Sequence, residues 1–270
     1  MLSRDDSDQT ARRCAADRRL AQALELVEEA ARDGARLRLV GGLAAYRYAV
    51  DRAFMARDYS DIDVIGTSAE AARLSRAFAR LGYRENRHVA QATAGGQLQF
   101  VRQTDPDEHV DVFLDVIRMD HDVDLRGRLD IDPCAISPAD VLLTKLQIGR
   151  LADKDVHDVL GLLKDLSLSD RDDDRSIAVR RIARVAARDW GIFVDVSANL
   201  DTVAAVARYD LSAVQRAAAI RRLAGLREAV ALEDKSLRFK LRARVGKRLP
   251  WRREVEERDG SPMVASRSAA

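Results

Sequence analysis

The sequence lacks the features of a membrane protein and of a disulfide-rich secreted protein. It has no run of about 18 consecutive apolar residues, the length that a membrane-spanning helix needs. Its two cysteines, Cys14 and Cys134, are too few and too far apart to suggest a disulfide framework. The N-terminal segment includes Asp5, Asp6 and Asp8 and has no basic region followed by an apolar one, as a secretory signal would. We therefore expect a cytoplasmic protein with no membrane partner.

Lysine is also scarce, because the chain has 6 lysines against 40 arginines. A GC-rich genome is the simplest explanation. Arginine serves most surface roles equally well, so a retained lysine can mark a site that needs a compact ammonium group. The first lysines along the chain are Lys145, Lys154 and Lys164. The net charge of +2 indicates no class of partner, because the charges are unevenly distributed.

The first half of the chain alternates between helix and strand patterns. Apolar spacing predicts a helix over 9–33 that stops at Gly34. Residues 51–60 are polar and are predicted as a loop, and Gly95-Gly96 and Asp105-Pro106-Asp107 are predicted as turns. Alternating or apolar runs predict strands over 36–40, 61–65, 83–87, 97–102 and 109–117, with helices over 42–50 and 68–81.

After Pro138 the pattern becomes helical throughout. Helices are predicted over 139–149, 154–166, 171–188, 198–209 and 211–232. A chain of 270 residues can form one large domain or two modest ones. We expect an α+β fold: a mixed sheet with flanking helices in domain 1–137, an all-helical domain over 138–234, and a basic, partly disordered tail over 235–270. The stretch 260–270 is small and polar and is predicted to be disordered.

Two alternate aspartates, Asp61 and Asp63, lie on the strand predicted over 61–65. Side chains two positions apart in a strand face the same way, at roughly 6.5–7 Å between their Cα atoms. A pair of carboxylates on one face repels unless a cation lies between them, and such hard oxygen ligands suit Mg²⁺ or Mn²⁺. The pair is weak evidence alone, because the same spacing recurs in an aspartate-rich chain, at 120–124, 130–132 and 153–155.

A third carboxylate is predicted on the strand over 109–117. Its even positions are apolar, and Asp111, Phe113 and Asp115 form the opposite face. An aspartate in such an apolar strand lowers stability unless it is exposed at an edge or binds a metal. If this strand pairs beside the strand of Asp61 and Asp63, three carboxylates converge. Asp111 is the first choice and Asp115 the alternative.

Gly41 and Gly42 join an apolar strand to the start of a helix. Glycines at such a junction allow a tight turn and let a phosphate approach the backbone, and the helix N-terminus favours the anion. Two glycines alone fit an ordinary strand-to-helix turn equally well. The aspartate pair that follows favours the phosphate interpretation, because a glycine turn and a carboxylate pair together indicate nucleotide chemistry.

This order of elements resembles the nucleotidyltransferase superfamily that includes polymerase β, CCA-adding enzymes and the minimal nucleotidyltransferases. Strand, Gly41-Gly42, helix and then Ser60-Asp61-Ile62-Asp63 carry the likeness. The segment from Ser137 to Gln147, followed by Lys154-Asp155-Val156-His157-Asp158, is similar to helices of abortive-infection toxin nucleotidyltransferases. The likeness covers residues 36–165, and its motifs are short but occur in the same order.

The resemblance implies a mixed-sheet nucleotidyltransferase fold with a site for a nucleoside triphosphate such as ATP. By this likeness Gly41 and Gly42 would hold the triphosphate, and Lys145 would neutralise its charge. Asp155 would hold that lysine or the base and ribose side of the site. Ser60 is expected on the nucleotide side. However, an 18-residue gap separates Gly42 from the aspartate pair, and it leaves the parts of Ser60 and Arg57 open.

By the same resemblance Asp61, Asp63 and Asp111 would bind Mg²⁺ or Mn²⁺ and, with Lys145 and Asp155, form the catalytic site. The implied reaction moves a nucleoside monophosphate from a nucleoside triphosphate to an acceptor hydroxyl and releases pyrophosphate. No role is assigned to His157. The histidines have no zinc-ligand spacing with either cysteine.

The segment from Lys235 to Arg253 holds nine basic residues and no acidic ones, with Phe239 and Trp251 among them. It is predicted to contact RNA, so that the acceptor would be an RNA 3′ end such as that of tRNA. The segment could equally be a helix that packs on its own domain, or a solvated end. A toxin-like role would add an antitoxin partner. The alternatives are a small-molecule hydroxyl as acceptor, such as an antibiotic, and a protein that binds nucleotides without catalysis.

Overall fold

The centre of the molecule is a five-stranded mixed sheet with the order β1-β2-β5-β4-β3. The computed structural model describes residues 4–206 and 211–253. Only β2 and β5 are parallel, and the other neighbouring strands are antiparallel. The strands are β1 (Arg38–Leu39), β2 (Ile62–Gly66), β3 (Tyr83–Glu85), β4 (Gln97–Arg102) and β5 (Asp105–Leu114). The protein therefore has the α+β architecture predicted from its sequence, with helices flanking a mixed sheet.

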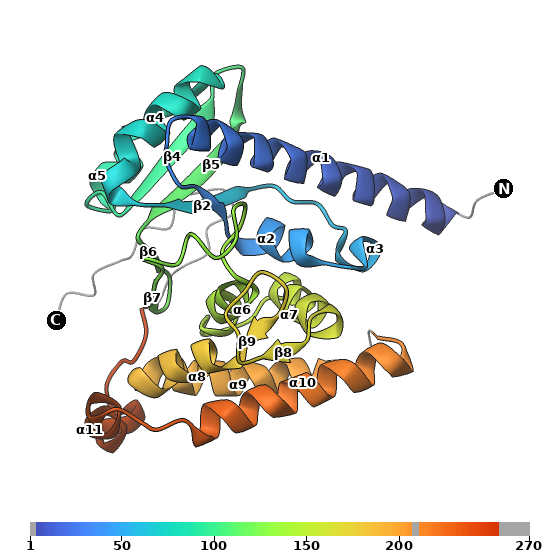
Figure 1. The fold of residues 1–270 in the computed structure, drawn as a ribbon, viewed down its shortest axis with the longest axis vertical. Coiled ribbons are helices and arrows are strands. Elements are labelled where there is room, and N and C mark those ends of the chain that lie inside the picture. Colours follow the sequence, from blue (N-terminus) through green and yellow to red (C-terminus); the bar gives the residue numbers. More distant parts are fainter. Residues whose placement is uncertain (1–3, 207–210, 254–270) are drawn as a thin grey trace.

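The helices form layers on either side of α2, which lies between the sheet and the later helices (Figure 1). α1 runs beside the sheet, and α8, α9, α10 and α11 lie at the opposite end of the molecule. The helices are α1 (Arg4–Arg32), α2 (Gly41–Tyr48), α3 (Arg52–Met55), α4 (Ala71–Arg80), α5 (Arg87–Ala92), α6 (Pro138–Leu146), α7 (Asp153–Asp165), α8 (Val179–Arg188), α9 (Trp190–Val206), α10 (Ala213–Leu232) and α11 (Leu237–Val245), with short 3₁₀ turns η1 (Ser68–Glu70) and η2 (Gly246–Arg248).

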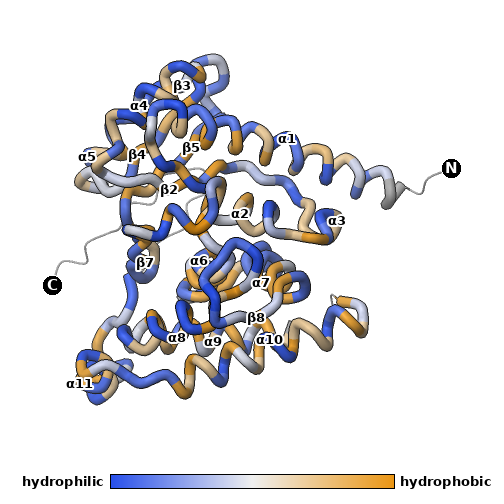
Figure 2. Tube along the Cα trace, in the orientation of Figure 1, coloured by the Kyte–Doolittle hydropathy of each residue, from blue (hydrophilic) through white to orange (hydrophobic). Residues whose placement is uncertain are grey.

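Strands β2 and β5 lie inside the sheet and are apolar for that reason. Ile62, Val64, Val110 and Val112 are each fully buried. Parallel strands are typically covered on both faces, so polar residues on them are costly unless they have partners. Hydrophilic and hydrophobic residues alternate in bands along the covering helices α1 and α10 (Figure 2). An aspartate on β2 or β5 therefore needs a specific explanation.

Helix α6 is the most enclosed helix near the sheet, because all nine of its residues are buried. Ser137 caps its N-terminus by accepting a hydrogen bond from the backbone N–H of Asp140, and Pro138 occupies the first helical position. Helix α2 packs against β2 on one side and against α6 and α7 on the other. This packing brings Lys145, which lies on α6, toward the carboxylates of the sheet.

The strand predicted over 109–117 is shorter at its end than expected. β5 stops at Leu114, because Asp115 adopts a left-handed backbone conformation with φ of 63°. The chain continues as β6 (Val116–Arg118), which pairs with β7 (Asp122–Asp124) in a separate small sheet. The turn predicted at Asp105-Pro106-Asp107 is also wrong. Those residues already belong to β5, since Asp105 pairs with Arg102 of β4.

Other boundaries differ where local capping overrides sequence periodicity. The predicted loop 51–60 contains α3. Asp51 caps the N-terminus of α3 by accepting a hydrogen bond from the backbone N–H of Phe54. The helix predicted over 171–188 begins only at Val179, because β8 (Leu168–Ser169) and β9 (Ile177–Ala178) form a short parallel pair. α9 begins at Trp190, eight residues before the predicted start at 198. α5 and β7 were not predicted.

The basic segment from Lys235 to Arg253 is folded onto the helical half. It contains α11, whose Ser236 N-cap accepts from the N–H of Phe239. Phe239 is buried and meets Phe193 of α9 edge-to-face at 5.3 Å between ring centroids. The disorder predicted for 260–270 concerns residues outside the described ones. Among the described residues, no helix combines the length and apolar character that a membrane crossing demands.

Candidate active site

The parallel pairing of β2 and β5 places Asp63 directly opposite Asp111. Residues paired in this way point to the same face of a sheet, with their Cβ atoms close together. Two aspartates therefore face each other on the two most enclosed strands of the molecule. The sequence could predict that each strand carried a carboxylate, but the pairing of these strands was an assumption.

His109 connects Asp61 to this pair. Its Nε2 lies 3.7 Å from an Oδ atom of Asp61 and 3.7 Å from an Oδ atom of Asp111. The side chain of Asp61 is 50% exposed, whereas that of Asp111 is 15% exposed. Asp63 and Asp111 thus share one face of the sheet, and His109 links Asp111 to Asp61, which lies just before β2 and is exposed. His109 was not assigned to this site from the sequence, because its spacing fits no zinc motif.

Burial and mutual repulsion raise the pKa values of the two facing carboxyls. Burial, followed by the charges of Asp111 and Asp61, raises the pKa of Asp63 from 3.8 to about 7. The pKa of Asp111 is also raised by burial, although His109 and two amides act in the opposite direction. Ionisation of these two carboxyls in the folded protein is therefore unfavourable, and a bound cation would offset that cost.

Two glutamines of β4 fix the orientation of Asp111. The side-chain amides of Gln97 and Gln99 donate to the same Oδ atom of Asp111, at 3.2 and 3.1 Å. Both glutamines are buried. The sequence carried a signal for them, since polar residues alternate with Leu98 and Phe100 on an inner strand. Such buried amides hold a carboxylate in one orientation and leave its other oxygen available.

The donor set suits Mg²⁺ or Mn²⁺, because it offers hard carboxylate oxygens on one face. Burial is the largest cause of the raised pKa values of Asp63 and Asp111, and the charge of Asp61 adds to both. Within residues 4–206 and 211–253, no three His, Cys, Asp or Glu side chains converge closely enough to form a finished metal site. The residues fit a divalent cation in chemistry, and Asp61 has the exposure needed to turn toward one.

Asp115, the alternative third carboxylate, lies elsewhere. Its backbone N–H donates to the carbonyl of Gly66, and one Oδ accepts from the N–H of Ser68 at 3.2 Å. Asp115 therefore ties the end of β5 to the 3₁₀ turn η1. Of the two aspartates left open by the sequence, Asp111 is the one that faces Asp63.

The turn between β1 and α2 lies against Asp63. Gly41 has a φ of 63°, in the left-handed region that favours glycine. A Cβ atom at Gly41 would lie 2.8 Å from Oδ2 of Asp63. The side chain of Val40 makes no capping hydrogen bond to α2. The turn thus presents helix N-terminal N–H groups next to the carboxylates, where they suit a phosphate.

We predict that Gly41→Ala lowers stability and activity together. The left-handed conformation costs a residue with a Cβ roughly 1–2 kcal/mol, and the added methyl would displace the carboxylate of Asp63. Gly82→Ala is the matched control, because Gly82 has a φ of 80° and a Cβ there would meet no atom within 4 Å. Urea unfolding should show a similar or larger loss at Gly41, and only Gly41→Ala should impair nucleotide transfer. Equal activity of the two variants would contradict this.

Lys145 is held by two aspartates of α7. Its Nζ lies 2.6 Å from Oδ1 of Asp155 and 3.0 Å from Oδ2 of Asp158. Burial alone would lower the pKa of Lys145, but Asp158 and Asp155 outweigh burial and hold that pKa above its ordinary value. The charge of Lys145 also lowers the pKa of Asp63, so the lysine is near the carboxylate face. The contact with Asp155 is the one that the sequence resemblance implied.

Arg57 is a neighbour whose part the sequence left open. One guanidinium nitrogen donates to both oxygens of Asp158, at 2.9 and 2.8 Å. The guanidinium lies 4.1 Å from the centre of the Tyr59 ring, and a Cβ at Gly42 would come 2.5 Å from the same nitrogen. Its Nε is buried and has no hydrogen-bond partner in the described part of the chain. Arg57 therefore offers a free donor beside the glycine turn.

Ser60 and His157 are the remaining residues considered from the sequence. Ser60 is exposed, and its carbonyl accepts a hydrogen bond from Arg19. Ser60 lines a cavity of about 360 Å³ among α1, residues 58–60 and the start of β5. His157 stacks on Phe54 at 4.3 Å between ring centroids.

The site therefore combines two facing carboxylates, a third at the solvent side, a glycine turn and a buried lysine. Arg57 and Lys145 share Asp158 as an ion-pair partner. No protein-family model matches the chain, and no curated protein matches it either.

Proposed function

We propose that the protein is a Mg²⁺- or Mn²⁺-dependent nucleotidyltransferase with a nucleotidyltransferase-type fold. It would transfer a nucleoside monophosphate from a nucleoside triphosphate to an acceptor hydroxyl and release pyrophosphate. The observation that carries the proposal is the register of β2 and β5, which sets Asp63 opposite Asp111 with Gly41 against Asp63. Carboxylates and a phosphate-binding turn in direct contact suit few chemistries other than phosphoryl or nucleotidyl transfer.

The chain offers separate groups for each part of the triphosphate. The N–H groups at the start of α2, from Gly41 and Gly42, would donate to phosphate oxygens. Lys145 would add a buried positive charge, which Asp155 and Asp158 hold in place. The unpaired Nε of Arg57 would be a further donor on the same side. These donors favour the charge that develops as the bond from the α-phosphorus to the bridging oxygen breaks.

Asp61, Asp63 and Asp111 would hold the cation. Bound Mg²⁺ would neutralise triphosphate charge and lower the pKa of the acceptor hydroxyl. Gln97 and Gln99 would keep Asp111 oriented toward the shared face. His109 would limit the repulsion between Asp61 and Asp111, because it lies 3.7 Å from each. The acceptor oxygen would then bond to the α-phosphorus as pyrophosphate departs.

The acceptor is proposed to be an RNA 3′ end. The basic segment of nine Lys and Arg residues between Lys235 and Arg253 supports RNA over a small uncharged acceptor. Its packing on α8 and α9 gives those charges fixed positions. A fixed basic surface favours a polyanion more than a solvated end does, because less side-chain entropy is lost on binding.

The test is nucleotide transfer with the full-length protein. Purified protein is incubated with Mg²⁺, each labelled nucleoside triphosphate in turn and total RNA, and labelled RNA is resolved on a denaturing gel. The matched negative control is Asp61→Asn/Asp63→Asn, which removes two charges and keeps side-chain size. An exposed pair on the same chain, Asp105→Asn/Asp107→Asn, controls for loss of charge alone.

Labelling by the wild type and by the exposed-pair variant, but not by Asp61→Asn/Asp63→Asn, is the expected result. Labelling of small hydroxyl compounds, with no labelling of RNA, would contradict RNA as the acceptor and indicate a small-molecule acceptor instead. Nucleotide binding that ignores Mg²⁺, together with no labelling of any acceptor, would contradict the enzyme itself.

A further inference from the structure

Two adjoining cavities lie on the helical half, beside the basic segment. A cavity of about 740 Å³ lies among β7, α8, α9 and the residues after α11, and a second cavity of about 390 Å³ adjoins it. The residues that line both cavities are Arg188, Asp189, Arg238, Pro250 and Trp251. We call this feature the arginine groove and define it by those five residues. Its combined size exceeds what one phosphate or one small ion requires.

Two arginines of the groove are left for a ligand. Most arginines around it are engaged: Arg181 pairs with Asp140, and Arg253 pairs with Asp122. Arg188 and Arg238 are exposed, and neither forms an ion pair with a carboxylate among residues 4–206 and 211–253. Asp120, Asp122, Asp124 and Asp189 also line the larger cavity, so the groove carries charges of both signs, and Arg188 and Arg238 supply its exposed guanidinium groups for a phosphate.

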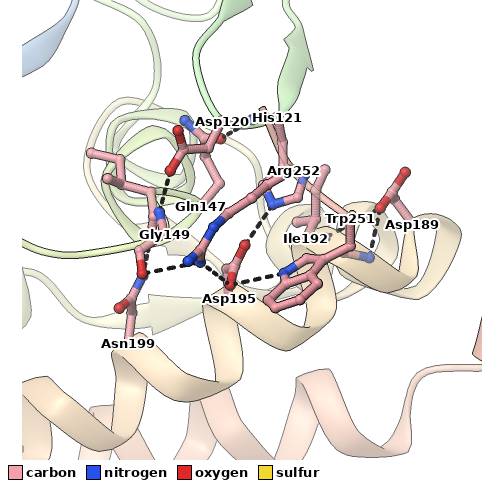
Figure 3. Close-up of polar contacts among 12 residues, drawn as sticks. Asp120, His121, Gln147, Gly149, Asp189, Ile192, Asp195, Asn199, Trp251 and Arg252 are labelled. Atoms are coloured by element: carbon pink, nitrogen blue, oxygen red, sulfur yellow. Dashed lines mark hydrogen bonds and ion pairs between the residues drawn. The ribbon is translucent and has the colours of Figure 1, made fainter. Parts of the chain in front are cut away.

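One wall of the groove is held by polar contacts that converge on Asp195 (Figure 3). Buried Asp195 accepts from Nε1 of Trp251 at 3.3 Å and from Arg252 at 3.0 Å, and lies 2.7 Å from Nε2 of His121. A Cβ at Gly191 would lie 2.8 Å from the His121 ring and 2.6 Å from the Trp251 carbonyl. The absence of a side chain there lets the two residues approach α9. Trp251 is therefore fixed by contacts on several sides.

Hydrogen bonds join one wall of the groove to the end of α6. The backbone N–H of His121 donates to the side chain of Gln147, just after α6, which carries Lys145. Asn199 donates to the carbonyls of Leu146 and Ile148 at the end of the same helix. The groove thus adjoins the end of the helix that carries Lys145.

We propose that the arginine groove binds the phosphodiester backbone of single-stranded RNA, through Arg188 and Arg238. This inference rests on the proposed function, because it identifies the surface that would bind the RNA acceptor. Guanidinium groups bind phosphates in a bidentate manner. Partly exposed Trp190 and Trp251 line the smaller cavity, with Arg242 over the Trp190 ring and Lys247 and Arg252 over the Trp251 ring.

The test measures binding without nucleotide, so that it does not depend on catalysis. A fluorescein-labelled single-stranded RNA of about ten nucleotides is titrated with full-length protein, and fluorescence anisotropy gives the Kd from about 50 to about 200 mM KCl. The variant is Arg188→Gln/Arg238→Gln. The matched control is Arg84→Gln/Arg87→Gln, which removes two exposed arginines near the sheet.

The groove variant should weaken binding on the order of tenfold at the lower salt concentration. The slope of log Kd against log salt should fall by about 1.4, since each contact with a single-strand phosphate contributes about 0.7. The control should change neither value by as much. Equal losses in both variants, or no RNA binding by the wild type, would overturn the inference.

Two further results separate this inference from the proposed function. An equal loss of affinity for a duplex of the same sequence would overturn the assignment to single strands. Loss of RNA binding in the groove variant, with no nucleotide transfer by the wild type, would support the groove and contradict the enzyme. Nucleotide transfer by the wild type, with RNA binding unchanged in the groove variant, would support the enzyme and contradict the groove.

Discussion

Asp63→Asn should abolish nucleotide transfer and yet stabilise the metal-free protein. The variant removes a carboxylate that faces Asp111, and we expect a loss of transfer on the order of a thousandfold. The same substitution removes a charge that burial and two neighbouring aspartates disfavour. Loss of activity with a gain of stability is the pattern expected where a fold retains a costly group for function.

The pH dependence of that gain follows from the direction of the pKa change. The pKa of Asp63 is raised from 3.8 to about 7 in the folded protein. Between these values the folded state holds a proton that the unfolded state has lost, so stability falls as pH rises. Above pH 7 the folded protein bears the full free-energy cost of ionising Asp63. Asp63→Asn should therefore stabilise the protein more at pH 8 than at pH 4.

The size of the gain is limited by solvent. Each pH unit between the two pKa values corresponds to ~1.4 kcal/mol. Asp63 is only partly buried, which reduces the full value, so we expect a gain of about 1–2 kcal/mol at pH 8. Urea unfolding with a chelator at both pH values measures it.

Added Mg²⁺ supplies the control for this experiment. It should raise the midpoint of wild-type unfolding and have a smaller effect on Asp63→Asn, because bound cation stabilises only the folded state. A variant that is less stable than the wild type at pH 8, or a gain of the same size at both pH values, would contradict the electrostatic argument.

The parts of the site that the sequence predicted depend on local rules. Strand alternation placed Asp61 and Asp63 on one face, and glycine chemistry marked Gly41 as the turn. The choice between Asp111 and Asp115 could not be made, because it depends on the backbone conformation of Asp115. A positive φ at a residue other than glycine leaves no clear signal in sequence periodicity.

The parts that sequence reasoning missed depend on contacts between distant segments. Arg57 and Asp158 are 101 residues apart, so no spacing pattern connects them. The glutamines that hold Asp111 could be found only as polar residues on an inner strand. The predicted basic tail became a packed segment because Trp251 and Arg252 meet Asp195 of α9. In each case the sequence pattern indicates one residue of the contact, but it does not indicate the distant residue that it contacts.

The second large effect is expected at Asp158, which has no exposed side-chain surface and serves both Lys145 and Arg57. Removing one member of a buried ion pair leaves the other without compensation, at a cost of about 3–5 kcal/mol. Asp158→Asn should therefore destabilise the protein by about 3 kcal/mol, as measured by urea unfolding. Asp153→Asn, at an exposed position of the same helix, should change stability by no more than about 0.5 kcal/mol. Similar losses in the two variants would show that the network contributes little.

A double-mutant cycle then relates this network to nucleotide binding. Arg57→Met and Asp158→Asn should show a coupling energy of about 1–3 kcal/mol in the absence of nucleotide, since the two side chains share two hydrogen bonds. If Arg57 turns to the triphosphate, as its unpaired Nε suggests, the coupling should decrease at saturating nucleotide and Mg²⁺. Arg57→Met should also weaken nucleotide binding, as measured by calorimetry, while Arg52→Met at the neighbouring α3 helix should not. An unchanged coupling with nucleotide bound would make Arg57 a structural partner of Asp158 alone, and Lys145 would then be the principal cation for the triphosphate.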